Sequence, residues 1–125
     1  DCINCSNDLD WKFIATVKKS VEDNMDNPSF NVDVLCNLLN MSRTSFYNKI
    51  KALTDQAPAD YIRLIRLKHA AQLLKGQKHT ITEISELTGF SDAKYFREVF
   101  KKHFNMSPSQ YAKRGKEGKD DKEIK

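Results

Sequence analysis

The sequence is poor in several features that large classes of protein require. No apolar run approaches the ~20 residues of a membrane-spanning helix, so we expect this chain to make no membrane contact. It has no glycine-rich phosphate loop, no Ser/His/Asp set and no pair of carboxylates with cleft spacing. We therefore predict that the chain is not an enzyme, has no catalytic residue and needs no cofactor.

Cysteine is also scarce, with three in the chain, and the three histidines, His69, His79 and His103, are scattered with no matching metal-ligand spacing. Cys2 and Cys5 have the spacing of half a zinc knuckle, but a tetrahedral site needs four ligands and no second pair follows. Cys36 lies in a periodic apolar stretch, and an odd number of cysteines is typical of a reduced compartment. We predict no metal site and a cytoplasmic location.

The chain begins at Asp1 rather than methionine and shows no signal peptide, so we expect it to be a piece of a longer polypeptide. Its length fits one modest domain or two small subdomains that share a helix. Helical periodicity dominates and strand signals are few. The predicted fold class is all-α.

A segment of roughly thirty residues is present twice. The first copy covers residues 32–61 and the second covers residues 81–111. Phe46 corresponds to Phe96, and Tyr61 corresponds to Tyr111. The second copy has one additional residue after its turn. A repeat of this length indicates one supersecondary unit that is used twice.

Each copy has the pattern of a helix, a sharp turn and a second helix. In the first copy, Ser42 can cap the second helix. In the second copy, Gly89 supplies the positive φ that a sharp turn needs, and Ser91 or Asp92 caps the helix that follows. This is the pattern of a helix-turn-helix.

A long helix is expected between the copies, from Pro58 to a terminator at Gly76. Its apolar residues spread around more than one face, so it should be covered on two sides and bridge both copies. Trp11, Leu38 and Leu87 are expected on the buried faces of other helices. The predicted fold has about seven helices, in two helix-turn-helix subdomains joined by a long central helix.

This organisation divides the chain into five parts. They are a disordered leader at residues 1–7, a first helix-turn-helix subdomain at 8–57, a linking helix at 58–75, a second subdomain at 76–112 and a disordered charged tail at 113–125. The tail is dominated by Lys, Gly, Asp and Glu, and it cannot bury enough apolar surface to fold.

Positive charge collects on the second helix of each copy. Residues 42–51 contain Arg43, Lys49 and Lys51 and no acid, and residues 94–103 contain four Lys or Arg residues and Glu98. The net charge of +4 is modest, so its placement is more informative than its size. Such a distribution of positive charge is expected of a surface that binds phosphates.

The second helix of a helix-turn-helix enters the major groove of DNA, where each base pair presents a distinct pattern of donors and acceptors. Once the apolar stripe is removed, long donors and aromatics are left facing outward. They are Arg43, Thr44, Tyr47, Asn48 and Lys51 in the first copy, and Lys94, Tyr95, Arg97, Glu98 and Lys101 in the second. An ordinary polar helix face has similar residues, but its recurrence behind the same turn favours DNA binding.

Three stretches carry a resemblance to a known family. They are residues 41–46 (MSRTSF), 89–96 (GFSDAKYF) and 100–111 (FKKHFNMSPSQY). Over roughly residues 9–112, the chain resembles the DNA-binding domain of AraC/XylS-type transcription regulators. The resemblance implies sequence-specific binding of double-stranded DNA, with two recognition helices in successive major grooves of one DNA face.

The resemblance also implies roles for single residues. It places base contacts on Thr44, Tyr47, Asn48, Lys94, Tyr95, Arg97 and Glu98, and phosphate contacts on Ser42, Arg43, Lys51, Ser91 and Lys101. Two positions depart from the family pattern. Asn105 stands where glycine is usual, which is a mild change because asparagine tolerates the left-handed conformation. Glu98 stands where arginine is common, so it could accept from the N4 amine of cytosine or repel phosphate.

A finer similarity is to the output domains of Bacteroides-type hybrid two-component sensors, carried by residues 45–54 (SFYNKIKALT) and 62–68 (IRLIRLK). It implies an upstream sensor and receiver, or another dimerising module, in the full-length protein. The parent would be anchored in the inner membrane, with this domain at the bacterial nucleoid.

Two other classes of function stay open at this point. Some alkylation-repair methyltransferases attach a cysteine-based zinc lobe to a domain of this type, and Cys2 and Cys5 would belong to such a lobe. A zinc assay separates that alternative from a regulator. The other class is a helical protein-interaction module, which would keep partner binding without binding duplex DNA.

Overall fold

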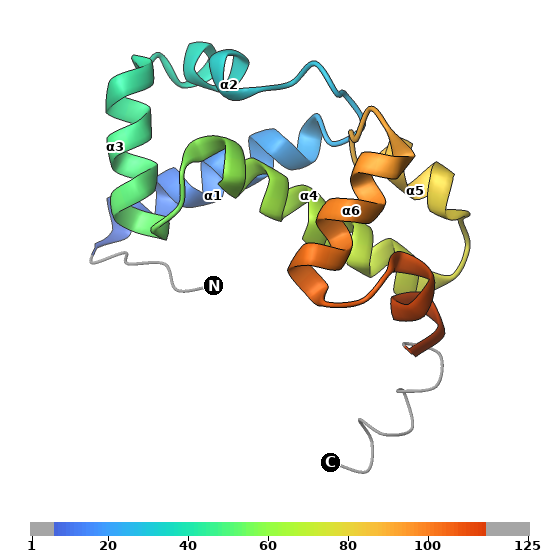
Figure 1. Ribbon diagram of the computed structural model, residues 1–125. Coiled ribbons are helices and arrows are strands. Elements are labelled where there is room, and N and C mark those ends of the chain that lie inside the picture. Colours follow the sequence, from blue (N-terminus) through green and yellow to red (C-terminus); the bar gives the residue numbers. More distant parts are fainter. Residues whose placement is uncertain (1–6, 115–125) are drawn as a thin grey trace. The chain divides into compact units, whose positions relative to one another are not determined.

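The computed structural model describes residues 7–114, and over that range it contains helices and no strand (Figure 1). The helices are α1 (Asp8–Asp23), α2 (Val32–Leu39), α3 (Arg43–Thr54), α4 (Pro58–Gly76), α5 (Ile81–Leu87) and α6 (Ala93–Phe104), followed by a last helical segment at residues 108–114. The predicted all-α class with about seven helices is confirmed. Within residues 7–114, no helix has the length and apolar character needed to cross a membrane.

The chain divides into two compact units, and the boundary between Arg66 and Leu67 falls inside α4. The first part of α4 contributes Tyr61, Ile62 and Ile65 to the core of the first unit. From Leu67 onward, the same helix contributes to the core of the second unit. The expectation that α4 carries apolar residues for both copies is confirmed.

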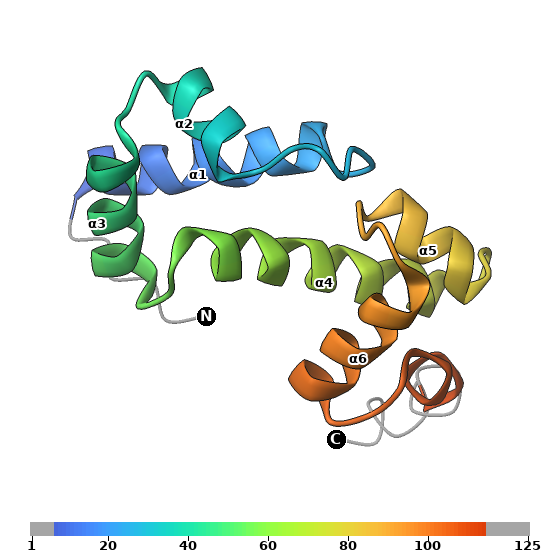
Figure 2. The same cartoon turned by 45° about the horizontal axis from the view of Figure 1, so that its top comes forward.

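The first unit encloses one apolar core between α1, α2, α3 and the first part of α4 (Figure 2). Phe46 and Ile50, which lie one turn apart on α3, are among its most deeply buried side chains. Full burial of side chains of this size stabilises the folded state by about 1.5–3 kcal/mol each. The buried residues are Ile14, Val17, Val21, Met25, Phe30, Leu35, Cys36, Phe46, Ile50, Leu53, Tyr61, Ile62 and Ile65.

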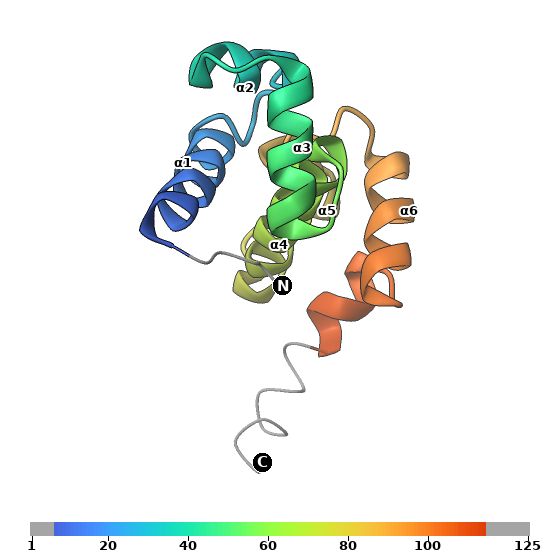
Figure 3. The same cartoon turned by 90° about the vertical axis from the view of Figure 1, so that its left-hand side faces the viewer.

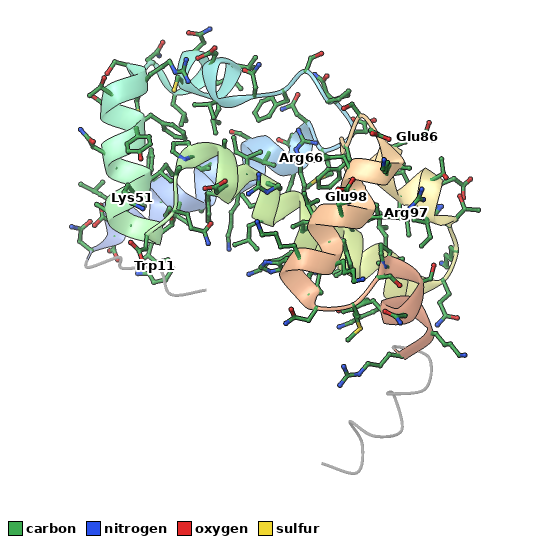
Figure 4. The ribbon with its side chains drawn as sticks, in the orientation of Figure 1. Trp11, Lys51, Arg66, Glu86, Arg97 and Glu98 are labelled. Atoms are coloured by element: carbon green, nitrogen blue, oxygen red, sulfur yellow. The ribbon has the colours of Figure 1, made fainter. Side chains whose placement is uncertain are left out.

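Buried Arg66 fixes the connection between α1 and α2 in the first unit (Figure 4). Its Nη1 donates to the carbonyl oxygen of Met25 at 2.7 Å, and its Nη2 donates to those of Asn27 at 3.1 Å and Phe30 at 3.3 Å. These carbonyls lie outside regular helix, so the guanidinium supplies partners that the backbone lacks. Burial lowers the pKa of the Arg66 guanidinium from its ordinary value, but arginine stays charged in proteins.

The second unit is built around a cluster of aromatic rings in tilted and edge-on contact. The ring centroids of Phe90 and Phe96 are 5.1 Å apart, those of Phe96 and Phe100 are 5.7 Å apart, and Tyr111 meets Phe100 edge-on at 5.4 Å. Tyr111 belongs to the last helical segment, which is thereby held against α6. The buried residues are Leu67, Ala70, Ala71, Leu74, Ile84, Phe90, Phe96 and Phe100.

Side-chain caps define where five helices begin. The caps are Asn7 for α1, Asn31 for α2, Ser42 for α3, Thr80 for α5 and Asp92 for α6. Each side chain accepts a hydrogen bond from a backbone N–H in the first turn, which would otherwise lack a partner. Of the two caps offered by the sequence for α6, the structure uses Asp92 rather than Ser91.

The repeat also appears in the backbone conformation. Asn40 (φ 55°) and Gly89 (φ 80°) occupy equivalent places in the two turns. Asp55 (φ 60°) and Asn105 (φ 61°) occupy equivalent places after α3 and α6. The left-handed conformation expected of Asn105 is therefore confirmed.

Several details differ from the sequence-based expectations. Trp11, Leu38 and Leu87 are 53%, 59% and 40% exposed rather than buried. Trp11 lies one turn before Ile14, the first buried residue of α1, and the short helices α2 and α5 are covered on one side only. The long helix also includes Gly76, and the residue that turns left-handed after it is Gln77.

The expected disordered leader and tail fall mostly outside the described residues, and so do Cys2 and Cys5. Asn7, which the sequence pattern placed in the leader, caps α1. Residues 113 and 114, which the pattern placed in the tail, belong to the last helical segment.

Candidate nucleic-acid interface

The helix pair α2–α3 forms the first helix-turn-helix (Figure 3). Its turn is closed by a backbone hydrogen bond of 3.0 Å from the N–H of Met41 to the carbonyl oxygen of Cys36, with Asn40 left-handed. Ser42 then takes an extended conformation, and its hydroxyl accepts from the N–H of Ser45 at 3.1 Å. These local bonds set the direction in which α3 leaves the turn.

The face of α3 that lies away from the core is exposed to solvent. Phe46 and Ile50 hold the opposite face in the core, with 1% and 0% of their surfaces exposed. The predicted contact residues of this copy are all exposed: Ser42, Arg43, Thr44, Tyr47, Asn48 and Lys51. They form what we call the α3 face.

Two basic residues of α3 are engaged by neighbours within the first unit. The Nζ atom of half-buried Lys49 lies 4.6 Å from the ring centroid of Phe13, so Lys49 faces α1 and does not belong to the α3 face. Of the three basic residues predicted on this stretch, Lys49 is thus less exposed than Arg43 and Lys51. Nε of Arg43 lies 3.2 Å from Oδ1 of Asp33, an exposed pair that solvent screens strongly. That pair joins α2 to α3, and no spacing rule in the sequence would have identified it.

The helix pair α5–α6 repeats this arrangement in the second unit. The N–H of Phe90 donates to the carbonyl oxygen of Ser85 at 2.9 Å, which is the counterpart of the bond that closes the first turn. At the start of α5, Thr80 and Glu83 form a capping box, with bonds of 2.8 and 3.1 Å. The second turn is thus closed by the same backbone hydrogen bond as the first.

The outer face of α6 is also exposed. Its predicted contact residues are all accessible: Ser91, Lys94, Tyr95, Arg97, Glu98 and Lys101. We call this set the α6 face, and Figure 4 shows Arg97 and Glu98 extending from the helix. Tyr95 is 45% exposed, and its ring packs at 6.2 Å against buried Phe90, so the core partly orients it. Exposed Lys102, which lies outside the predicted contact residues, adds a further positive charge next to Lys101.

Residues 7–114 also bear on metal-binding and thiol chemistry. No group of three or more His, Cys, Asp or Glu side chains in that range could hold a metal ion. Burial raises the pKa of the Cys36 thiol, and the charge of Asp33 adds to that effect while Arg43 opposes it. A buried, protonated thiol is a poor nucleophile.

A family model described as a helix-turn-helix domain matches residues 35–114, a range that includes both turns, α3 and α6. The chain belongs to this family, in its AraC-type form. A structure of an AraC-type DNA-binding domain protein from Chromobacterium violaceum shares the fold, with a TM-score of 0.78 at 23% identity over 87% of this chain and 96% of that one.

Two curated relatives extend the comparison. The chain is 46% identical over 106 residues to Histidine kinase P4 of Formosa agariphila. The aligned segment covers 85% of this chain and 8% of that protein. It is 33% identical over 108 residues to the Msm operon regulatory protein of Streptococcus mutans, which covers 86% of this chain and 38% of that protein. The chain therefore spans less than half the length of either relative.

Two solved structures share both fold and recognisable sequence. The C-terminal domain of the two-component response regulator yesN from Fusobacterium nucleatum has a TM-score of 0.73 at 27% identity, covering 81% of this chain and 98% of that one. The DNA-binding domain of AdpA, solved in complex with a target DNA, has a TM-score of 0.72 at 26% identity, covering 78% of this chain and 87% of that one.

Proposed function

We propose that this chain is the DNA-binding domain of a transcription regulator and that it recognises a specific sequence in double-stranded DNA. In this proposal, α3 and α6 enter successive major grooves on one side of the duplex. The observation that carries it is the duplication of an exposed polar and basic helix face behind the same closed turn. The family membership and the DNA complex of the AdpA domain support it.

The exposed residues of the two recognition helices are assigned to two kinds of DNA contact, following the resemblance to AraC/XylS-type regulators. On that basis we assign base contacts to Thr44, Tyr47, Asn48, Lys94, Tyr95, Arg97 and Glu98. On the same basis we assign phosphate contacts to Ser42, Arg43, Lys51, Ser91 and Lys101, whose hydroxyl and basic side chains suit phosphates.

The regulatory signal is expected to come from outside this chain. We infer that the full-length protein carries an upstream sensor and receiver, or another dimerising module. The likeness to a histidine kinase and to a response-regulator C-terminal domain supports this inference. The proposed location of this domain is the bacterial cytoplasm, at the nucleoid. The proposed division of the chain remains a first subdomain at 8–57, a linking helix at 58–75 and a second subdomain at 76–112.

The proposal is tested by selecting duplexes from a random library with residues 1–125 and measuring affinity for selected and unrelated sequences at fixed salt. We expect the selected duplex to bind at least about 10³-fold more tightly, the lower range for specific recognition. Equal affinity for both duplexes would overturn the proposal. Zinc content measured on the same preparation tests the repair-enzyme alternative, for which one bound zinc per chain is required.

A further inference from the structure

The two recognition helices hold the same register relative to their cores. Phe46 of α3 and Phe96 of α6 occupy equivalent places in the repeat, and their exposed fractions are 1% and 0%. Five residues further along, Lys51 and Lys101 are both exposed and identical in type. Residues at matching places on α3 and α6 therefore occupy matching places on the two outer faces.

Three other pairs of matching places on the two helices hold different chemistry. The α3 face carries uncharged side chains at three places where the α6 face carries charged ones. The pairs are Thr44 and Lys94, Tyr47 and Arg97, and Asn48 and Glu98. All six side chains are exposed. The anchoring lysine is thus repeated, while the residues assigned to the bases have diverged.

The uncharged residues of the α3 face suit A·T pairs. The amide of Asn48 can donate to N7 and accept from the N6 amine of adenine, which is a bidentate pairing. The methyl group of Thr44 can pack against the C5 methyl group of thymine. Tyr47 is 46% exposed and offers a ring and a hydroxyl without charge.

The charged residues of the α6 face suit G·C pairs. Arg97 can donate two hydrogen bonds to O6 and N7 of guanine, whereas Glu98 can accept from the N4 amine of cytosine. Among the described residues, no ion pair engages either side chain. Neighbouring positions on a helix do not face each other, so Arg97 and Glu98 are not expected to neutralise one another.

The chemistry of Glu98 also allows discrimination by exclusion. The major-groove edge of guanine presents only acceptors, so a carboxylate facing it would lose its hydration without gaining a donor. Its matching residue, Asn48, can both donate and accept and carries no such restriction. Glu98 can only accept hydrogen bonds, whereas most other residues of the α6 face are basic or neutral. Its carboxylate therefore adds specificity by disfavouring DNA sites that place guanine opposite it.

We propose that the chain recognises an asymmetric site with A·T pairs under α3 and G·C pairs, with cytosine facing Glu98, under α6. The proposal rests on the proposed function, since it requires both helices to lie in major grooves. It gives the DNA site a direction, because exchanging its two halves would place each helix over the wrong bases.

The test is a reciprocal exchange, carried out on the full 125-residue chain. Duplexes are selected with the wild type, with Asn48→Glu and with Glu98→Asn. The wild type should select one A·T-rich half and one half containing G·C. Asn48→Glu should change adenine to cytosine in the first half alone, and Glu98→Asn should change cytosine to adenine in the second half alone. Each change should alter the preference between the two bases by roughly 5- to 150-fold.

Glu86→Asn is the matched control, because exposed Glu86 lies on α5, outside the two recognition helices, and its replacement removes the same charge as Glu98→Asn (Figure 4). It should leave both base preferences unchanged. Specific binding without the A·T and G·C division would overturn the inference and leave the proposed function standing. The inference also fails, with the proposed function intact, if both exchange variants alter the same half or neither alters any. A wild type that selects no sequence would instead overturn the proposed function itself.

Discussion

Single side chains on the α6 face are expected to contribute to binding in two different ways. Arg97 and Lys101 are both exposed and lie four residues apart on α6, so they share one side of the helix. Contacts to phosphates carry no sequence information, whereas contacts to base edges do. The assignment of Lys101 to a phosphate and Arg97 to a base can therefore be separated by experiment.

Lys101→Ala should weaken binding to all duplexes alike and reduce the slope of log affinity against log salt by about one unit. Arg97→Ala should cost roughly 1–3 kcal/mol on the preferred duplex and relax the preference at one base pair. Titrations at several salt concentrations, on selected and unrelated duplexes, measure both effects. Lys75→Ala serves as a charge-matched control away from the recognition helices. Equal losses of specific and non-specific affinity in both variants would show that the division is wrong.

Arg66 illustrates a residue whose role is structural. Arg66→Met should destabilise the first unit by about 3 kcal/mol or more, because it removes charged donors and leaves buried carbonyls of the α1–α2 connection unpaired. Arg63→Met on the same helix removes only a pair with Asp60 that is largely exposed, and it should change stability by less than about 1 kcal/mol. Denaturant unfolding followed by the fluorescence of Trp11, the only tryptophan, reports on this unit. A difference between the variants below about 1 kcal/mol would contradict the account.

At the scale of the helices, the two recognition helices end in the same way. Asp55 follows α3 and Asn105 follows α6, both with left-handed backbone, and the N–H of each donates to a carbonyl oxygen one turn earlier. Such an ending satisfies a carbonyl that would otherwise lack a partner. The left-handed region costs an ordinary residue about 1–2 kcal/mol, whereas glycine visits it freely and asparagine at a reduced cost.

Asn105→Ala should therefore destabilise the second unit by about 1 kcal/mol, and Asn105→Gly should leave its stability unchanged or slightly raised. Amide hydrogen exchange of α6 measures the second unit separately from the first. If alanine and glycine gave the same exchange rates at this position, the conformational argument would fail.

Local signals explain why much of this architecture could be predicted from the sequence. The caps Ser42 and Asp92, the turn glycine Gly89 and the buried Phe46 and Phe96 are all visible as residue types at fixed spacing. All the candidate contact residues are exposed, as a surface that meets DNA requires.

The features that were missed depend on contacts between different elements of the fold. Lys49 makes a cation–π contact with Phe13, which lies 36 positions earlier in the sequence. Arg43 forms an ion pair with Asp33, which lies on the other side of the turn. The carbonyl partners of Arg66 lie 36 to 41 positions away, on an irregular connection. Helical periodicity shows which residues share a face, but it does not reveal which faces other helices cover.

At the scale of the whole molecule, the chain consists of two small units that share one helix and each present one recognition face. Neither recognition face needs a second copy of the chain to be complete, since every turn and cap is formed within one chain. A dimerising module upstream would raise the affinity for paired sites by about 10²–10⁴ without any new contact.

The isolated chain should therefore be monomeric and bind a two-site duplex without cooperativity. Analytical sedimentation establishes the oligomeric state of the chain without DNA. Titrations on one-site and two-site duplexes establish the cooperativity of DNA binding. Strong cooperative binding to paired sites by this chain alone would place a dimer contact within these 125 residues.

Hydroxyl-radical footprinting of the chain on its selected duplex tests the central claim most directly, because it reports the number, spacing and DNA face of the contacted segments together. Two recognition helices in successive major grooves predict two protected segments whose centres are about 10–10.5 base pairs apart on one face of the DNA. Ala substitution at Asn48 or at Arg97 should then weaken one segment each. A single short protected segment, or two segments on opposite faces, would contradict the account.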